Sequence, residues 1–212
     1  MENQPVTFCG ISENLLSLAK TGQYRWNKRD LTYCIYDRVP GIAADDFADV
    51  IGAGYKAWAE VCDLRFTQVT DYRKADLLVL ARRIDRKGGI LAEHQLPPGN
   101  DMQLRGWLDL AESWTLDMLL AVWTHELGHG CGLSHIDTPN SLMNPFYNPA
   151  ISKPQAADVK AVQALYGAPK PANPTQPPVP PSPGSPNSFT GMVEIPPGLL
   201  PGVYQLEFTQ KI

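Results

Sequence analysis

Three of the chain's four histidines fall within eleven residues, in the segment HELGHGCGLSH that runs from His125 to His135. His125 and His129 are four residues apart, so on a helix both imidazoles leave the same face and can bind one ion. Gly132 can end such a helix and turn the chain sharply, which would bring back His135 as a third ligand. The fourth position of a tetrahedral zinc ion would then be open to water, as in catalytic zinc sites.

Glu126 follows the first of these histidines. Its carboxylate can reach a water on the ion without being a ligand itself, which is what a general base requires. The pattern therefore predicts metal-assisted hydrolysis, with Glu126 moving the protons. Two alternatives stay open at this point. The histidines could be ordinary polar residues on a helix and its following turn, or the metal could only stabilise a non-catalytic binding or structural module.

The elements that would position these residues can be predicted from the periodicity of apolar residues. Helices are expected within residues 42–62 and 115–131, and from a Ser152 cap, with Gln155 in a capping box, to Gly167. Strands are expected at residues 31–37, 64–69, 75–81 and 104–108, with a short edge strand in ILAEH at residues 90–94.

The length and the proline distribution predict one well-buried domain with smaller additions. The chain has 212 residues, and many of its 20 prolines fall in residues 168–187, which are expected to form a semi-rigid linker. The folded body would then occupy residues 23–167, after an N-terminal segment at residues 1–22. Residues 188–212 contain two apolar alternations, FTGMVEI and GVYQLEF, which could pair as a short β segment that docks an unknown partner.

Charge and cysteine usage exclude several classes of protein. A net charge of −4 without a basic stripe argues against a nucleic-acid surface. The sequence contains no run of about 18 apolar residues, so no membrane span is expected. The first residues lack the basic segment followed by an apolar segment that is typical of a signal peptide. The four cysteines form no CxxC pair, so they indicate neither a disulfide scaffold nor a cysteine-only zinc site.

The histidine motif and a later methionine together resemble the metzincin metallopeptidases, and within them the matrixins, the matrix metalloproteinase group. Met143, in SLMNPFYNP, lies eight residues beyond His135, which is the matrixin spacing. The resemblance covers about residues 9–167, because RWNKRDLTYCIYD, DLAESWT and KPQAADVKAVQALYG are also similar to matrixin segments. It implies an α+β fold of the metzincin type, with three helices and a twisted five-stranded sheet that is largely parallel but has one antiparallel edge strand.

The resemblance also implies a zinc-dependent endopeptidase that acts on extended protein substrates outside the cell. Met143 would pack beneath the zinc site, a role close to that of an ordinary core residue. Pro145 and Tyr147 would wall the pocket for the residue after the cleaved bond, and Ala121 would form its floor. The substrate strand would pair along residues 89–93.

Two further metal sites can be compared with the family. Positions of calcium ligands are matched by Asp85, Gly88, Gly89, Asp109 and Glu112, although a merely solvated acidic loop is the alternative. Matrixins usually hold a second, structural zinc with three histidines and an aspartate. In this chain Glu93 and Trp107 stand at two of the histidine positions, and His94 is shifted by one residue. We therefore expect the second zinc to be absent.

Cys9, in FCGIS, lies 17 residues before Trp26. A Cys-Gly at this distance belongs in matrixins to the pro-segment, where the thiolate takes the fourth zinc position and inhibits the enzyme. Phe8 replaces the family's arginine before the cysteine, and Ser12 and Glu13 replace the Pro-Asp after it. Cys9 is therefore a candidate inhibitory ligand, and a thiol without a regulatory role is the alternative.

Overall fold

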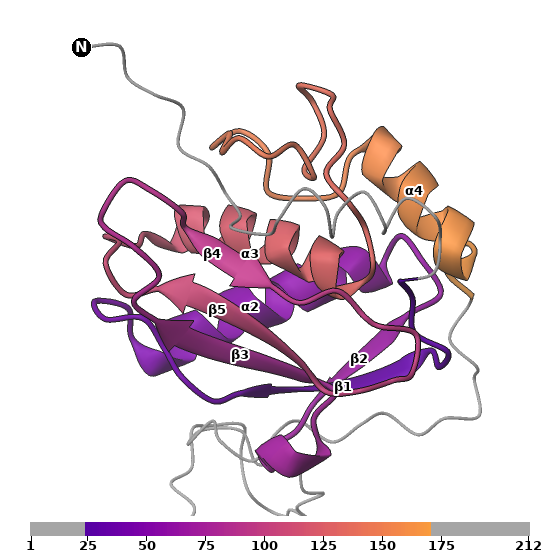
Figure 1. Cartoon of the computed structure of the whole chain (residues 1–212), viewed down its shortest axis with the longest axis horizontal. Helices are drawn as coiled ribbons and strands as arrows, with labels where there is room; N and C mark the ends of the chain where they lie inside the picture. Colours follow the sequence, from indigo (N-terminus) through magenta and orange to yellow (C-terminus); the bar gives the residue numbers. More distant parts are fainter. Residues whose placement is uncertain (1–23, 171–212) are drawn as a thin grey trace, which may run out of the picture. The chain divides into compact units, whose positions relative to one another are not determined.

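The structure is a computed structural model that describes residues 24–170 (Figure 1). This part of the chain contains a five-stranded sheet and three α-helices. The expectations for Cys9, for most of the linker and for residues 188–212 fall outside this range and stay predictions. None of the helices within it is long and apolar enough to cross a bilayer. The strands are β1 (Asp30–Ile35), β2 (Arg65–Gln68), β3 (Leu77–Arg82), β4 (Ala92–His94) and β5 (Leu104–Asp109), and the helices are α2 (Ala44–Ala59), α3 (Leu116–Gly130) and α4 (Ala156–Tyr166), with a 3-10 turn η1 (Tyr72–Lys74) before β3.

The strand order in the sheet is β2-β1-β3-β5-β4. All neighbours are parallel except β4, which pairs antiparallel with β5 at the edge, with His94 opposite Gly106. The central strand β3 is a continuous apolar run because both of its faces are covered: Leu77 and Val79 lie in the main core, and Leu78 in a smaller cluster on the other face. The mixed five-stranded sheet implied by the family resemblance is confirmed.

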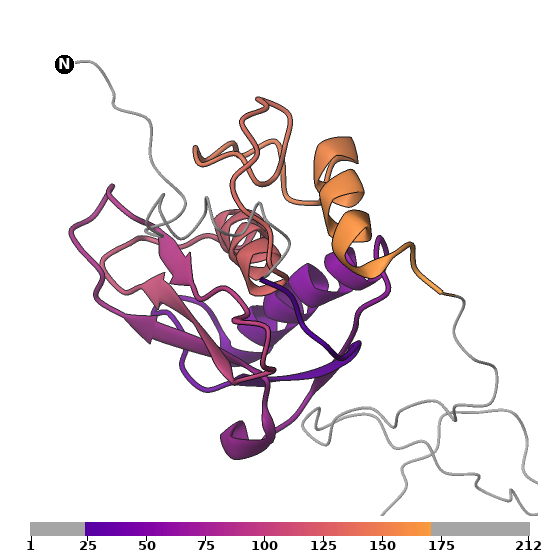
Figure 2. The ribbon, with the colours of Figure 1, turned by 45° about the vertical axis from the view of Figure 1, so that its right-hand side comes forward.

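Helices α2 and α3 pack against each other on the same side of the sheet (Figures 1 and 2). The buried face of α2 carries Phe47, Ile51, Tyr55 and Trp58, at the spacing of one helical stripe. Trp58 joins the two helices directly, because its indole Nε1–H donates to the carbonyl oxygen of Thr124 at 2.8 Å. The helix that carries the histidine motif is thus held by contacts with both α2 and the sheet.

Helix α3 begins and ends with local signals that its sequence carries. Thr115 caps the start, where its hydroxyl accepts a hydrogen bond from Met118 N–H at 3.2 Å. At the other end Gly132 has φ +95°, a conformation that favours glycine. Gly132 N–H donates to His129 O at 2.7 Å and Leu133 N–H to Gly128 O at 2.9 Å, the pattern of a Schellman turn. The predicted stop at Gly132 is confirmed.

Helix α4 starts later than the sequence suggested. Ser152 was the expected cap, and this expectation is wrong: the N-cap is Gln155, and the first helical residue is Ala156. The physical reason is the position of Asp158, whose Oδ2 accepts a hydrogen bond from Gln155 N–H at 2.7 Å. Asp158 is completely buried against a distant turn, so a tertiary contact decides where this helix begins.

Candidate metal centre

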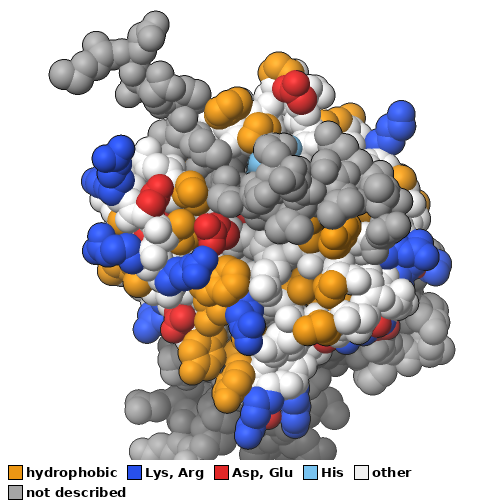
Figure 3. All heavy atoms as spheres, viewed as in Figure 1, with side chains coloured by type: hydrophobic (Ala, Val, Ile, Leu, Met, Phe, Trp, Pro, Cys, Tyr) orange, Lys and Arg blue, Asp and Glu red, His pale blue; other side chains and the backbone are white. Residues whose placement is uncertain are grey.

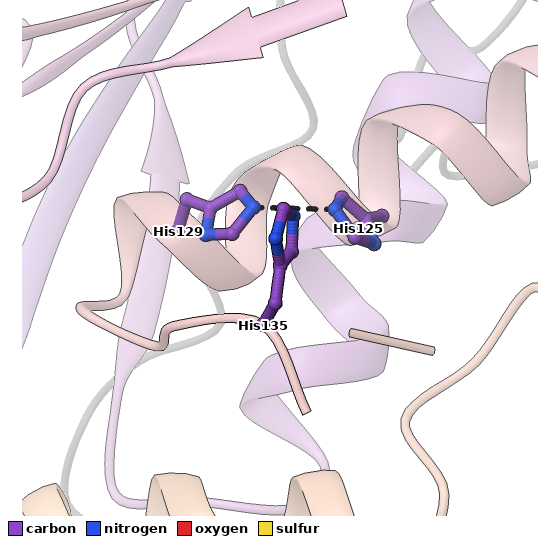
Figure 4. Close-up of side chains that lie close together, drawn as sticks. All are labelled: His125, His129 and His135. Atoms are coloured by element: carbon purple, nitrogen blue, oxygen red, sulfur yellow. Dashed lines mark hydrogen bonds between the residues drawn. The ribbon is translucent and has the colours of Figure 1, made fainter. Parts of the chain in front are cut away.

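The three histidines of the motif converge on one point (Figure 4). His125 and His129 project from α3, and His135 comes from the loop that follows the Gly132 turn. One ring nitrogen from each lies within 4.8 Å of the others, and the Nε2 atoms of His125 and His129 are 3.2 Å apart. Within residues 24–170 this is the only group of three or more such side chains that could hold a metal ion.

Backbone carbonyl groups orient two of the rings. His125 Nδ1 lies 2.7 Å from Leu142 O, and His129 Nδ1 lies 2.8 Å from Leu133 O. Because a carbonyl oxygen can only accept, each Nδ1 carries the proton and each Nε2 presents a lone pair. Two lone pairs 3.2 Å apart repel each other unless a cation lies between them. The arrangement therefore fits a bound metal ion.

Burial keeps these imidazoles in the form that binds metal. Desolvation lowers the pKa of His125 to about 3, and it holds the pKa of His129 well below its usual value. Both rings are completely buried, whereas His135 is partly exposed. Figure 3 shows histidine atoms at the surface beside hydrophobic side chains. His125 and His129 are thus neutral rings at neutral pH, and His135 is the partly exposed member of the group.

Glu126 is completely buried on α3, one position after His125. The loop after His135 packs against the same helix. Met143 is also completely buried, and a Cβ built on Gly128 would lie 2.3 Å from its Sδ. Gly128 therefore leaves the room in which the methionine packs against α3, directly before His129.

Asp158 fastens this loop and was missing from the expected site residues. Its carboxylate accepts hydrogen bonds from Ser141 Oγ–H, from Leu142 N–H at 2.8 Å and from Met143 N–H at 3.2 Å. The carbonyl of Leu142 in turn orients His125. The sequence signal that could have found Asp158 is its place three residues after Gln155, the N3 position of a capping box, but the expected cap at Ser152 put it beyond the first turn.

The expected pocket residues lie on two elements. Ala121 is buried on α3, one turn before His125. Pro145 and Tyr147 are partly exposed in the loop after Met143, and burial raises the pKa of the Tyr147 hydroxyl.

The expected calcium ligands lie partly in the loop at residues 84–90 and partly in Asp109 and Glu112, which accept hydrogen bonds from it. Asp109 is completely buried and accepts hydrogen bonds from the N–H groups of Ile84, Asp85 and Ala111. Glu112 accepts one from Gly88 N–H at 2.6 Å, and Gly88 has φ +82°. The Oδ1 atom of Asp85 is buried and has no hydrogen-bond donor among the described residues. The three carboxylates do not approach each other as closely as the histidines do.

The positions expected for the second zinc hold a different arrangement. The guanidinium group of Arg82 forms an ion pair with Glu93 and lies 4.5 Å from the ring centroid of Trp107. His94 points the other way, is 2% exposed and lies against α3, and burial lowers its pKa to about 4. Glu93 and Trp107 thus have partners that link strands β3, β4 and β5.

Comparison with known proteins gives one consistent answer. A family model described as matrixin matches residues 25–167. The macrophage metalloelastase of Rattus norvegicus is 35% identical over 176 residues, which are 76% of this chain and 37% of that protein. Stromelysin-1 of Equus caballus is 33% identical, and matrix metalloproteinase-18 of Xenopus laevis is 35% identical, with coverage of 76% and 75% of this chain. The chain spans 37% of the length of each of these relatives.

Removing the Asp158 carboxylate should weaken metal binding although Asp158 is not itself a ligand. In Asp158→Ala, Leu142 is no longer held, so its carbonyl orients His125 less well, and we expect zinc affinity to fall about 10- to 100-fold. Ser141→Ala should show a smaller loss in the same direction. Competition with a chromophoric chelator measures the affinity. Asp137→Ala, an exposed acid in the same loop, is the control, and an Asp158→Ala affinity equal to that of the control would contradict the assignment.

Proposed function

The chain belongs to the matrixin family, and we propose that it is a zinc-dependent endopeptidase that cleaves extended protein substrates. The observation that carries the proposal is the pair of facing Nε2 atoms of His125 and His129, whose Nδ1–H groups are both bound to carbonyl oxygens. Three imidazoles with a fourth position left to water are a known ligand set of catalytic zinc. Zinc held by these residues would lower the pKa of a bound water toward about 7 and would polarise the scissile carbonyl.

Glu126 is proposed as the general base and then the general acid. It takes a proton from the attacking water and delivers that proton to the leaving amine. Its place on α3, next to His125, supports this role because the same rigid helix carries two of the proposed ligands.

The edge strand β4 is proposed to align the substrate. Asp109 N–H donates to Leu91 O and Gln95 N–H donates to Arg105 O, so the backbone groups of Leu91, Glu93 and Gln95 face β5. In an antiparallel pair these groups alternate, and those of Ala92 and His94 therefore point away from β5. An extended peptide that pairs with them adds one strand to the sheet, which suits many sequences. This extends the expected contact region by one residue, to His94.

The alternative is a non-catalytic module whose metal only stabilises the fold. A structural zinc site usually has four protein ligands, and a carboxylate beside an open position has no use there. Glu126 next to a three-histidine group therefore favours the enzyme.

Replacement of Glu126 by glutamine tests the mechanism. Glu126→Gln should keep zinc bound and lower turnover of a quenched peptide by about 10²- to 10⁴-fold, because only the proton transfer is lost. Glu60→Gln, at an exposed position after α2, is the matched control and should cleave at the normal rate. Full activity in Glu126→Gln would refute the mechanism. A zinc-loaded parent chain without turnover would favour the structural module.

The pocket for the residue after the cleaved bond should be apolar and roomy. Ala121 would form the floor of this pocket, and its small side chain leaves room. Peptides with Leu or Met directly after the cleaved bond should therefore be preferred. Ala121→Leu should shift the preference toward smaller residues. A peptide-library profile gives the answer, and a preference of the parent chain for Asp or Lys there would contradict the proposal.

Calcium is proposed to stabilise the loop at residues 84–90. The buried, unpartnered Oδ1 of Asp85 supports this, because a bound cation would compensate it. Calcium at 100 times its Kd should raise the free energy of unfolding by about 2.7 kcal/mol, since it binds only the folded state.

Asp85→Asn and Glu112→Gln should lose this stabilisation and keep their zinc, while Asp137→Asn should keep both. Thermal unfolding of zinc-loaded protein, with and without added calcium, measures the effect. A melting temperature of the parent chain that calcium leaves unchanged would argue against a site in this loop.

A further inference from the structure

His94 fills the space between the edge of the sheet and the end of α3. It is the last residue of β4 and is 2% exposed. A Cβ built on Gly106 of β5 would lie 2.4 Å from His94 Cδ2, and one built on Gly130 of α3 would lie 2.6 Å from His94 Cε1. Both distances are shorter than real contacts, so the imidazole fits only because both neighbours are glycines.

Packing against its neighbours, more than hydrogen bonding, holds the ring in place. Its Nδ1–H donates to Gln95 O at 2.7 Å, and Nε2 has no hydrogen-bond partner among the described residues. The Trp123 ring lies beside it, with 5.9 Å between the ring centroids. Only one of the two ring nitrogens forms a hydrogen bond, so the imidazole acts here mainly through the volume that it fills between the two glycines.

On one side, the His94 ring contacts the C-terminal end of α3, which carries the proposed ligand His129. Gly130 directly follows His129, and its carbonyl oxygen accepts a hydrogen bond from Trp26 Nε1–H at 2.8 Å. The next carbonyl, that of Cys131, accepts one from Tyr166 Oη–H at 2.7 Å. These bonds hold the end of α3 from other directions, so the His94 ring presses against a part of the helix that cannot easily yield.

On the other side, the backbone of His94 belongs to β4, the edge strand proposed to pair with the substrate. The backbone N–H and C=O of His94 point away from β5, toward the position proposed for the peptide. His94 therefore connects the two halves of the site: its main chain faces the substrate, and its ring touches the residue after His129.

We propose that His94 is a positioning residue that sets the distance between the substrate edge of β4 and the metal-binding end of α3. This inference rests on the proposed function. Its consequence is selective: when the ring is lost, ligands that span both β4 and the metal should bind less well, and ligands that touch only the metal should bind as before.

Two hydroxamates distinguish these cases in the zinc-loaded full chain. Acetohydroxamate contacts the metal alone, whereas a tetrapeptide hydroxamate also reaches β4. In His94→Ala the inhibition constant of the peptide hydroxamate should rise about tenfold or more and KM for a long peptide substrate should rise with it, while the constant for acetohydroxamate should change less than about twofold. Gly130→Ala should show the same selective loss, because its Cβ would displace the ring. The double variant His94→Ala/Gly130→Ala should recover much of it.

Ile51→Ala, in the α2 core, is the matched control for simple destabilisation and should leave the ratio of the two constants unchanged. If Gly130→Ala does not fold, the ratio in His94→Ala compared with Ile51→Ala still decides. An unchanged ratio in His94→Ala, or an equal loss for both probes, would overturn the inference while leaving the proposed function intact. A parent chain that binds zinc but neither hydroxamate would overturn both.

Discussion

The 3.2 Å contact between the Nε2 atoms of His125 and His129 is the constraint on which the other contacts of the site depend. Neutral imidazoles in a buried position keep their lone pairs directed at each other only if something fixes the opposite side of each ring. The carbonyl groups of Leu142 and Leu133 do so, and each belongs to a turn that needs support of its own. Much of the structure around α3 serves to hold those two turns.

The two turns are supported in different ways. The turn after α3 is local: Gly132 adopts the positive φ, and the Schellman bonds place Leu133 O within hydrogen-bonding distance of His129 Nδ1. The turn at residues 141–143 depends on Asp158 of α4, which accepts hydrogen bonds from three of its donors. A residue on the last helix thereby orients a ring on the helix that carries the histidine motif. Glycines at 128 and 130 then let Met143 and His94 approach α3 closely on either side of His129.

Features that depend on local sequence could be predicted. The helix with the histidines, the stop at Gly132, and the approximate ranges of the strands follow from periodicity and from the preference of glycine for positive φ. The Ser152 cap was wrong because Asp158 decides the start of α4, and Asp158 is held by a turn 15 to 17 residues earlier in the chain. The role of His94 could not be foreseen for the same reason. Its fit against Gly106 and Gly130 exists only once β4, β5 and α3 are packed, and in the sequence it was seen only as a displaced zinc ligand.

We propose that one zinc ion is held by Nε2 of His125, Nε2 of His129 and one ring nitrogen of His135, with one position left for water. Zinc K-edge X-ray absorption of the zinc-loaded full chain tests it most directly, in the Cys9→Ser variant so that this thiolate cannot take the fourth position. We expect three imidazole nitrogens at about 2.0–2.1 Å and one further light atom. A sulfur scatterer at about 2.3 Å, or fewer than three imidazoles, would contradict it.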